Sequence, residues 1–165
     1  MKKAPHILTK RLTLRPILPT DSQNITYLLH PKIQEHAGPY MPHSLEDLTT
    51  HIQRITSSTS WLIELNGKVI GDIGVFSTQD NRTGEMAWYL DPDHWQSGYS
   101  TEAGLAVINY MFTKLGYGKL TAPICGKNTA SRRLAEKLGF THECIKPNSE
   151  LYGVEADVHH YLITN

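Results

Sequence analysis

The stretch that decides the fold is Gly84-Glu-Met-Ala-Trp-Tyr-Leu-Asp-Pro-Asp-His-Trp-Gln-Ser-Gly-Tyr-Ser-Thr101. A strand pattern from Gly84 to Leu90 passes through a turn into a small-residue loop, residues 96–100, and a helix is predicted to begin at Thr101. No bulky aliphatic side chain covers the amides of this loop. Free N–H groups and the positive end of a helix dipole would therefore point at one place, which suits a pyrophosphate. An ordinary strand-to-helix turn is the alternative.

Patterns on both sides of this stretch predict strands and helices along the whole chain. Asn66-Gly67 predicts a tight hairpin, and Ser44 with Asp47 predicts a helix start. Asn128 is expected to cap a short helix that Gly139 ends. Residues 31–42 have the composition of an irregular loop. Strands are predicted at 11–15, 61–65, 69–76, 84–90, 119–124, 141–146 and 154–162, and helices after Thr20, Ser44, Ser100 and Asn128.

Length and composition limit the class of protein. A chain of 165 residues fits a single domain, residues 1–165, with a core that needs no disulfide or metal. Sixteen basic and sixteen acidic residues leave no net charge, so neither nucleic acid nor a membrane is expected as partner. No apolar run approaches the ~20 residues of a membrane span, and no secretion signal opens the sequence, so we expect a cytoplasmic protein. Cys125 and Cys144 are expected to be buried small hydrophobes.

Four segments, in order, resemble the GNAT N-acetyltransferases, closest to the branch that acetylates ribosomal-protein N-termini. They are residues 9–16, 84–103, 128–131 and 136–140. The resemblance implies an α/β (α+β) fold with a mixed, mostly antiparallel sheet of about seven strands and about four helices, splayed between residues 84–90 and 119–124. It also implies acetyl-CoA as co-substrate, a peptide N-terminus or a small-molecule amine as acceptor, and no metal. A monomer or a homodimer is expected.

The resemblance also assigns the cofactor-binding residues. The amides of Gln96, Ser97, Gly98, Tyr99, Ser100 and Thr101 would hold the CoA pyrophosphate. Backbone groups of Trp88, Tyr89 and Leu90 would pair with the pantetheine arm as if it were another strand. Asn128 would contact a pantetheine carbonyl, or it only caps its helix. The family's loop has Gln or Arg where this chain has Trp95, and Gly or Ala where it has Ser100. The Ser100 hydroxyl would weaken CoA binding or add a hydrogen bond.

Acetyl transfer to an amine needs an uncharged amine, donors for an oxyanion, and a proton for the departing thiolate. Backbone N–H groups near Tyr89 and Leu90 are the expected oxyanion donors. The resemblance makes Glu150 a candidate base, although a solvated turn carboxylate is the alternative and the segment that follows it is one residue short. Glu85 is the competing candidate for the base and would act through a water molecule. Alternatively, it is only a solvent-facing strand residue. Ser131 matches the serine that the branch uses near the sulfur, or it only satisfies helix amides.

One alternative function belongs to another class: a catalytically weak acyl-CoA-binding sensor or partner-binding module. Many members of the superfamily place a tyrosine four residues before the helix-ending glycine, and Ala135 stands there in this chain. This absence and the short segment after Glu150 favour the alternative. The loop at 31–42, with His36 and Tyr40, is expected to form a wall for the acceptor. His159 and His160 are expected to face opposite sides of a strand, so they cannot chelate one metal together.

Overall fold

The computed structural model describes residues 4–35, 41–56, 58–79, 82–151 and 153–165. Within these residues eight strands form one sheet in the order β1-β2-β3-β4-β5-β6-β8-β7. Neighbouring strands are antiparallel except β5 and β6, which are parallel. The strands are β1 Ile7–Leu8, β2 Leu12–Pro16, β3 Thr59–Leu65, β4 Lys68–Ser77, β5 Thr83–Leu90, β6 Lys119–Cys125, β7 Thr141–Leu151 and β8 Val154–Thr164. The α-helices are α1 Pro31–Gln34, α2 Leu45–Ile55, α3 Tyr99–Thr113 and α4 Thr129–Lys137, and the 3-10 helices are η1 Asp21–Leu29 and η2 Pro92–His94.

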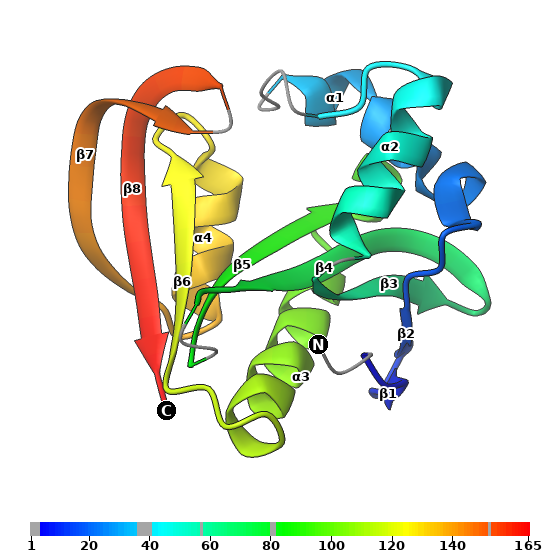
Figure 1. Ribbon diagram of the computed structural model, residues 1–165, viewed down its shortest axis with the longest axis horizontal. Helices are drawn as coiled ribbons and strands as arrows, with labels where there is room; N and C mark the ends of the chain where they lie inside the picture. The colour runs from blue at the N-terminus through cyan, green and yellow to red at the C-terminus, as the bar shows by residue number, and fades with distance from the viewer. Residues whose placement is uncertain (1–3, 36–40, 57, 80–81, 152) are drawn as a thin grey trace.

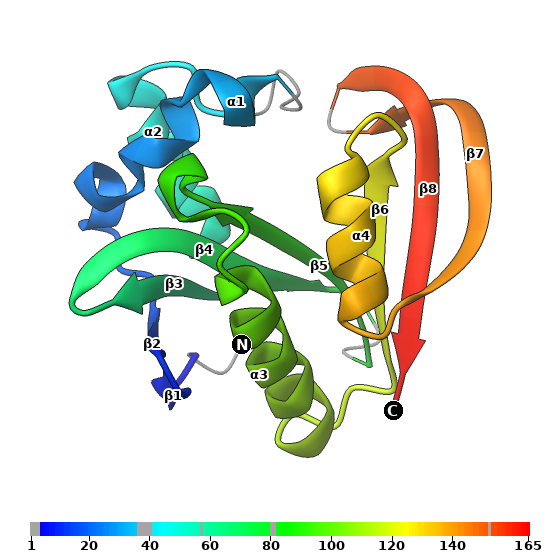
Figure 2. The same ribbon diagram turned by 180° about the vertical axis from the view of Figure 1, so that it is seen from behind.

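Helices cover both faces of the sheet, as Figures 1 and 2 show from the two sides. α3 and α4 lie on one face, where Val107, Met111 and Leu138 join the larger hydrophobic core. η1, α1 and α2 lie on the other face and build a second core around Leu28 and Ile52. Burial of these apolar side chains is the main favourable term in folding.

The alternation of side chains along β5 shows which face each residue serves. Met86 and Leu90 belong to the core beneath α3, whereas Tyr89 packs against the core beneath α2. Glu85 pairs with Phe76, which also packs against the α2 core. Glu85 and Tyr89 therefore point toward the face that carries η1 and α2.

The sheet splits between its two parallel strands. β5 and β6 pair only at Thr83–Lys119, Gly84–Leu120 and Glu85–Thr121. Beyond Glu85 they diverge into the V that Figure 1 shows, while β5 continues to pair with β4 and β6 with β8. The splayed, mixed α/β sheet expected from the sequence is confirmed.

Several details differ from the sequence-based expectation. The sheet described here has eight strands instead of about seven, because two residues, Ile7–Leu8, add a short strand that no periodicity could reveal. Pro31–Gln34 is a helix, since Pro31 stands at its first turn, where a missing N–H costs nothing, and His30 Nδ1 accepts the Lys32 N–H at 3.1 Å. Residues 36–40 of the expected acceptor wall, which include His36 and Tyr40, lie outside the described residues.

Two further corrections concern the C-terminal strands. β7 extends to Leu151 instead of ending at Lys146, because a bulge between Lys146 and Ser149 absorbs Pro147 and Asn148. Cys125 and Cys144 are free and only half-buried, since they lie on strands of the open arm of the V, so the expectation of buried thiols is wrong.

Predictions that depend on residues close together in the sequence, such as helix caps and tight turns, are confirmed. Ser44 Oγ accepts the Asp47 N–H at 3.2 Å and caps α2. Asn66 and Gly67 both adopt positive φ, 50° and 81°, as the tight hairpin requires. None of the helices in the described ranges is both long enough and apolar enough to span a membrane.

Candidate functional site

The open edge of β5 forms one side of the site. Asp91 donates its N–H to Ile70 O at 2.8 Å, so the backbone of Asp91 faces β4. Because backbone direction alternates along a strand, the N–H groups of Trp88 and Leu90 face the split instead. These two amides have no strand opposite them among the described residues, since β6 pairs with β5 only as far as Glu85. A ligand that enters the split finds strand-like donors there.

The backbone N–H and C=O groups of Tyr89 face β4 and not the split. Its carbonyl oxygen lies beside the Gly71 backbone, and Tyr89 pairs with Asp72 of β4. Because an arm in the split can meet only every second residue of β5, we expect it to contact the main chain of Trp88 and Leu90 rather than that of Tyr89. The phenol of Tyr89 instead points toward α2.

The loop after β5 presents a cluster of amides. Gln96 and Gly98 both adopt left-handed backbone conformations, with φ of 61° and 78°, and α3 begins at Tyr99, two residues earlier than expected. In residues 82–151, the N–H groups from Gln96 to Thr101 donate to no protein acceptor, and no side chain caps the helix. Unpaired amides at a helix N-terminus favour an anion, which makes this loop the candidate pyrophosphate site.

Trp95 explains how this loop is held without the usual Gln or Arg. Its indole Nε1 donates to Leu90 O at 2.7 Å, which ties the loop back to the end of β5. The bond uses the Leu90 carbonyl and leaves the Leu90 N–H to the split. A tryptophan at this position therefore joins the open strand edge to the amide loop.

The α4 side of the split carries the other predicted groups. Asn128 Oδ1 accepts the Ser131 N–H at 3.1 Å, so the capping role is real. The cap uses only the carbonyl oxygen, and the Asn128 Nδ2 group can still donate to a ligand. Ser131 is half-buried in the first turn of α4. Ala135 is fully buried in the core with Leu138, and a tyrosine at this position could not be accommodated without rearrangement.

The two candidate carboxylates lie far apart. Glu85 stands at the last paired rung of the split, opposite Thr121, which pairs with Leu162 of β8. Glu150 is exposed near the end of β7 and pairs with Glu155 of β8. The seven residue steps along β8 from Glu155 to Leu162 span roughly 20 Å at about 3.3 Å per step. The structure therefore does not bring Glu85 and Glu150 to one amine.

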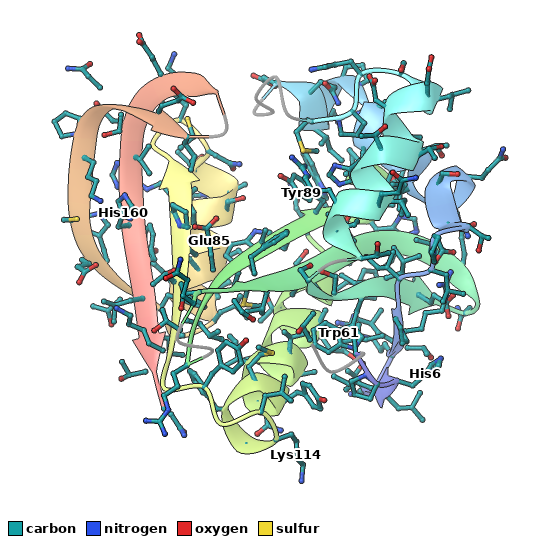
Figure 3. The ribbon with its side chains drawn as sticks, viewed as in Figure 1. His6, Trp61, Glu85, Tyr89, Lys114 and His160 are labelled. Carbon is teal, nitrogen blue, oxygen red and sulfur yellow. The ribbon has the colours of Figure 1, made fainter. Side chains whose placement is uncertain are left out.

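Two titratable side chains, His160 and Tyr89, lie to either side of Glu85 in Figure 3. Burial lowers the pKa of His160 on β8, and the nearby Lys146 lowers it further, while Glu143 and Glu85 act in the opposite direction. Burial raises the pKa of Tyr89 to about 12, with Asp72 adding to the rise, so this phenol is protonated at neutral pH. Beside Glu85 the site thus has a histidine that tends to be neutral and a tyrosine that keeps its proton.

A buried pair beneath Tyr89 was missed by sequence reasoning. Tyr27 of η1 donates to Asp72 Oδ1 at 2.6 Å across 45 residues of chain. Burial raises the pKa of Asp72 to about 7 despite this hydrogen bond. In the sequence, Asp72 looks like an ordinary polar residue of the β4 strand pattern. Its burial becomes evident only from the packing of η1 over the sheet.

Replacing Asp72 with asparagine should make stability less dependent on pH. The folded protein retains the Asp72 proton up to about pH 7, whereas an unfolded aspartate loses it near pH 4, so this group's stabilising contribution falls as pH rises from 4 to 7. The D72N variant lacks this loss and keeps an oxygen for Tyr27. Its unfolding free energy relative to wild type should rise between pH 4.5 and 8, by no more than about 4 kcal/mol.

Urea denaturation at several pH values measures this difference. D47N is the matched control, because exposed Asp47 has a lowered pKa owing mainly to the His43 N–H, and its effect should be constant above pH 5. Parallel pH curves for wild type and D72N would show that Asp72 does not titrate in this range.

Comparisons with known proteins agree with this geometry. The family model described as "Acetyltransferase (GNAT) domain" matches residues 11–141. The "uncharacterized N-acetyltransferase YoaA" of Bacillus subtilis is 30% identical over 149 residues, which cover 84% of each chain. The chain therefore belongs to the GNAT acetyltransferase family, as its motifs predicted, and it is an acetyl-CoA-dependent acetyltransferase.

Solved structures support the fold. RimL, a ribosomal alpha-N-protein acetyltransferase in complex with coenzyme A, superposes with a TM-score of 0.84 at 19% identity and covers 96% of both chains. MccE, a microcin self-immunity acetyltransferase in complex with acetyl-CoA and AMP, superposes with a TM-score of 0.82 at 18% identity and covers 94% of this chain and 93% of its own. At these identities the likeness concerns the fold.

Proposed function

We propose that this protein transfers the acetyl group of acetyl-CoA directly to a primary amine. The observation that carries the proposal is the split sheet: its strand edge at Trp88 and Leu90 is unpaired among the described residues, and it leads into the amides of residues 96–101, which find no acceptor within residues 82–151. A donor with a pyrophosphate and an amide-containing arm matches both features. The likeness to RimL, an alpha-N-protein acetyltransferase, supports a peptide N-terminus as acceptor, and the likeness to MccE, whose structure also holds AMP, supports a small molecule as the alternative.

The two faces of the split suit direct transfer. Ser131 stands on the face of α3 and α4, whereas Glu85 points to the face of η1 and α2. Donor and acceptor can thus approach from opposite sides. We assign the removal of the amine proton to Glu85, directly or through one water, with Glu150 as the alternative.

The remaining chemistry falls to the backbone and to α4. The N–H groups of Trp88 and Leu90 are the donors available to a carbonyl oxygen that gains charge during attack. The amine nitrogen forms the new C–N bond as the C–S bond breaks, and the thiolate must then take up a proton. We assign Ser131 as the acid that protonates the sulfur. Asn128 Nδ2 would donate a hydrogen bond to a carbonyl of the pantetheine arm.

A thiol-release assay tests the proposed function. Acetyl-CoA is offered with peptides that differ in their first residue, with amino acids, and with polyamines. We expect turnover with at least one primary amine and none with N-terminally blocked peptides. CoA binding by calorimetry without any turnover would instead indicate an acyl-CoA-binding module, and absence of CoA binding would refute the donor site. The cytoplasmic location, the single domain and the oligomeric state remain predictions.

A further inference from the structure

The N-terminal segment is bonded to the first turn of α3, beside the amide loop. Thr9 Oγ1 donates to Glu102 Oε1 at 2.6 Å, and the Arg11 backbone N–H donates to the same oxygen at 2.7 Å. Arg11 Nε donates to Glu102 Oε2 at 2.7 Å. Both carboxylate oxygens of Glu102 are therefore held by a segment that lies 91 residues away in sequence.

The Arg11 side chain continues from Glu102 onto the loop itself. Its Nη1 donates to Ser97 O at 3.0 Å, and its guanidinium carbon lies 4.5 Å from the centre of the Tyr99 ring. Its Nη2 lies 3.4 Å from the point that a Cβ on Gly98 would occupy. One guanidinium thus contacts Ser97 and Tyr99 and lies close to Gly98, and these three residues are the middle of the proposed pyrophosphate site.

Glu102 creates an electrostatic problem at this site. Burial acts to raise its pKa, but the hydrogen bonds from Thr9 and Arg11 outweigh burial and lower it, so the carboxylate is charged at neutral pH. Its own N–H donates to Gly98 O at 3.0 Å, which places Glu102 one helical turn from the loop. A carboxylate and a pyrophosphate would compete for the same positive helix end and repel each other.

Stability alone does not account for the Arg11–Glu102 pair. The Arg11 side chain is 41% exposed, and exposed ion pairs contribute little to folding. The pair also places the guanidinium against both the Glu102 carboxylate and the loop. A planar guanidinium suits this task because it bonds a carboxylate, bonds a carbonyl and stacks on a ring at the same time.

We propose that Arg11 is a positioning residue for the phosphate end of the donor: it holds the 97–99 loop in its anion-binding shape and neutralises Glu102 there. This inference rests on the proposed donor site. It assigns Arg11 no part in the acetyl transfer itself. Loss of Arg11 should therefore weaken the binding of acetyl donors that carry phosphates. The binding of donors that lack the pyrophosphate should not change.

The test compares acetyl-CoA with S-acetylpantetheine, a donor without the pyrophosphate, in the variants R11M, R11K and R11M/E102Q. We expect R11M to raise KM for acetyl-CoA about tenfold, with kcat and the KM for S-acetylpantetheine within twofold of wild type. R11K should recover part of the loss because it keeps the charge. R11M/E102Q should recover most of it because no uncompensated carboxylate remains. Thermal melting should be similar for all variants.

Two results would overturn the inference. An unchanged KM for acetyl-CoA in R11M would mean that the loop does not need Arg11. A rise in KM by the same factor for both donors would mean that Arg11 serves only the fold. A lower melting temperature of R11M, with no recovery of KM in R11M/E102Q, would mean the same. These outcomes differ from failure of the proposed function, in which wild type itself neither binds CoA nor releases thiol.

Discussion

The E85Q variant is expected to turn over acetyl-CoA about 10²- to 10⁴-fold more slowly than wild type, with KM for acetyl-CoA nearly unchanged. Glu85 is half-buried at the last paired rung of the split and points toward the α2 face. Glutamine keeps the size and the hydrogen-bonding oxygen but cannot accept the amine proton. Because a higher pH supplies more uncharged amine, the loss should shrink as pH rises toward the pKa of the acceptor.

E150Q is the matched control for this prediction. It makes the same chemical change at an exposed position of β7, roughly 20 Å along the sheet. We expect its kcat to stay within threefold of wild type. If E150Q loses the activity and E85Q keeps it, the base is Glu150. If both variants keep full activity, neither carboxylate is the general base.

The second large effect should follow substitution of Gly98 by valine. Gly98 has φ of 78°, and a side chain there approaches Arg11 Nη2. A β-branched residue avoids this backbone conformation, so the loop must change shape and its amides no longer converge. We expect CoA affinity, measured by calorimetry, to fall at least tenfold.

Gly116 offers a control with the same backbone strain. It has φ of 74°, lies beyond the far end of α3, and no atom would lie within 4 Å of an added Cβ. G116V should lose stability through the same conformational cost, yet bind CoA as wild type does. Equal loss of CoA affinity in G98V and G116V would show that the effect is general destabilisation and not damage to an anion site.

The sequence predicted those features that depend on neighbouring residues. Asn66-Gly67 formed its hairpin, and Ser44 and Asn128 capped their helices, because the interacting groups are two or three residues apart. The helix at Pro31 was missed because proline is equally common where a helix ends and in the first turn of a new helix. The amide loop was predicted from composition, but the prediction that it binds CoA came from the resemblance to a family.

Features that join distant segments were out of reach of the sequence. Tyr27 meets Asp72 and Arg11 meets Glu102 only after the sheet has formed. The direction of each backbone group on β5 also depends on its register with β4, so the sequence alone could not show that the Tyr89 backbone faces β4. Such contacts leave no periodic pattern because each involves a single residue from each segment.

A structure determined with CoA bound tests the central claim most directly. The account predicts the pyrophosphate on the amides of residues 96–101 and the thioester end of the pantetheine arm in the split, beside the N–H groups of Trp88 and Leu90 and not beside that of Tyr89. CoA bound on the outer surface of η1, or lying outside the split with these amides bonded to water, would contradict it.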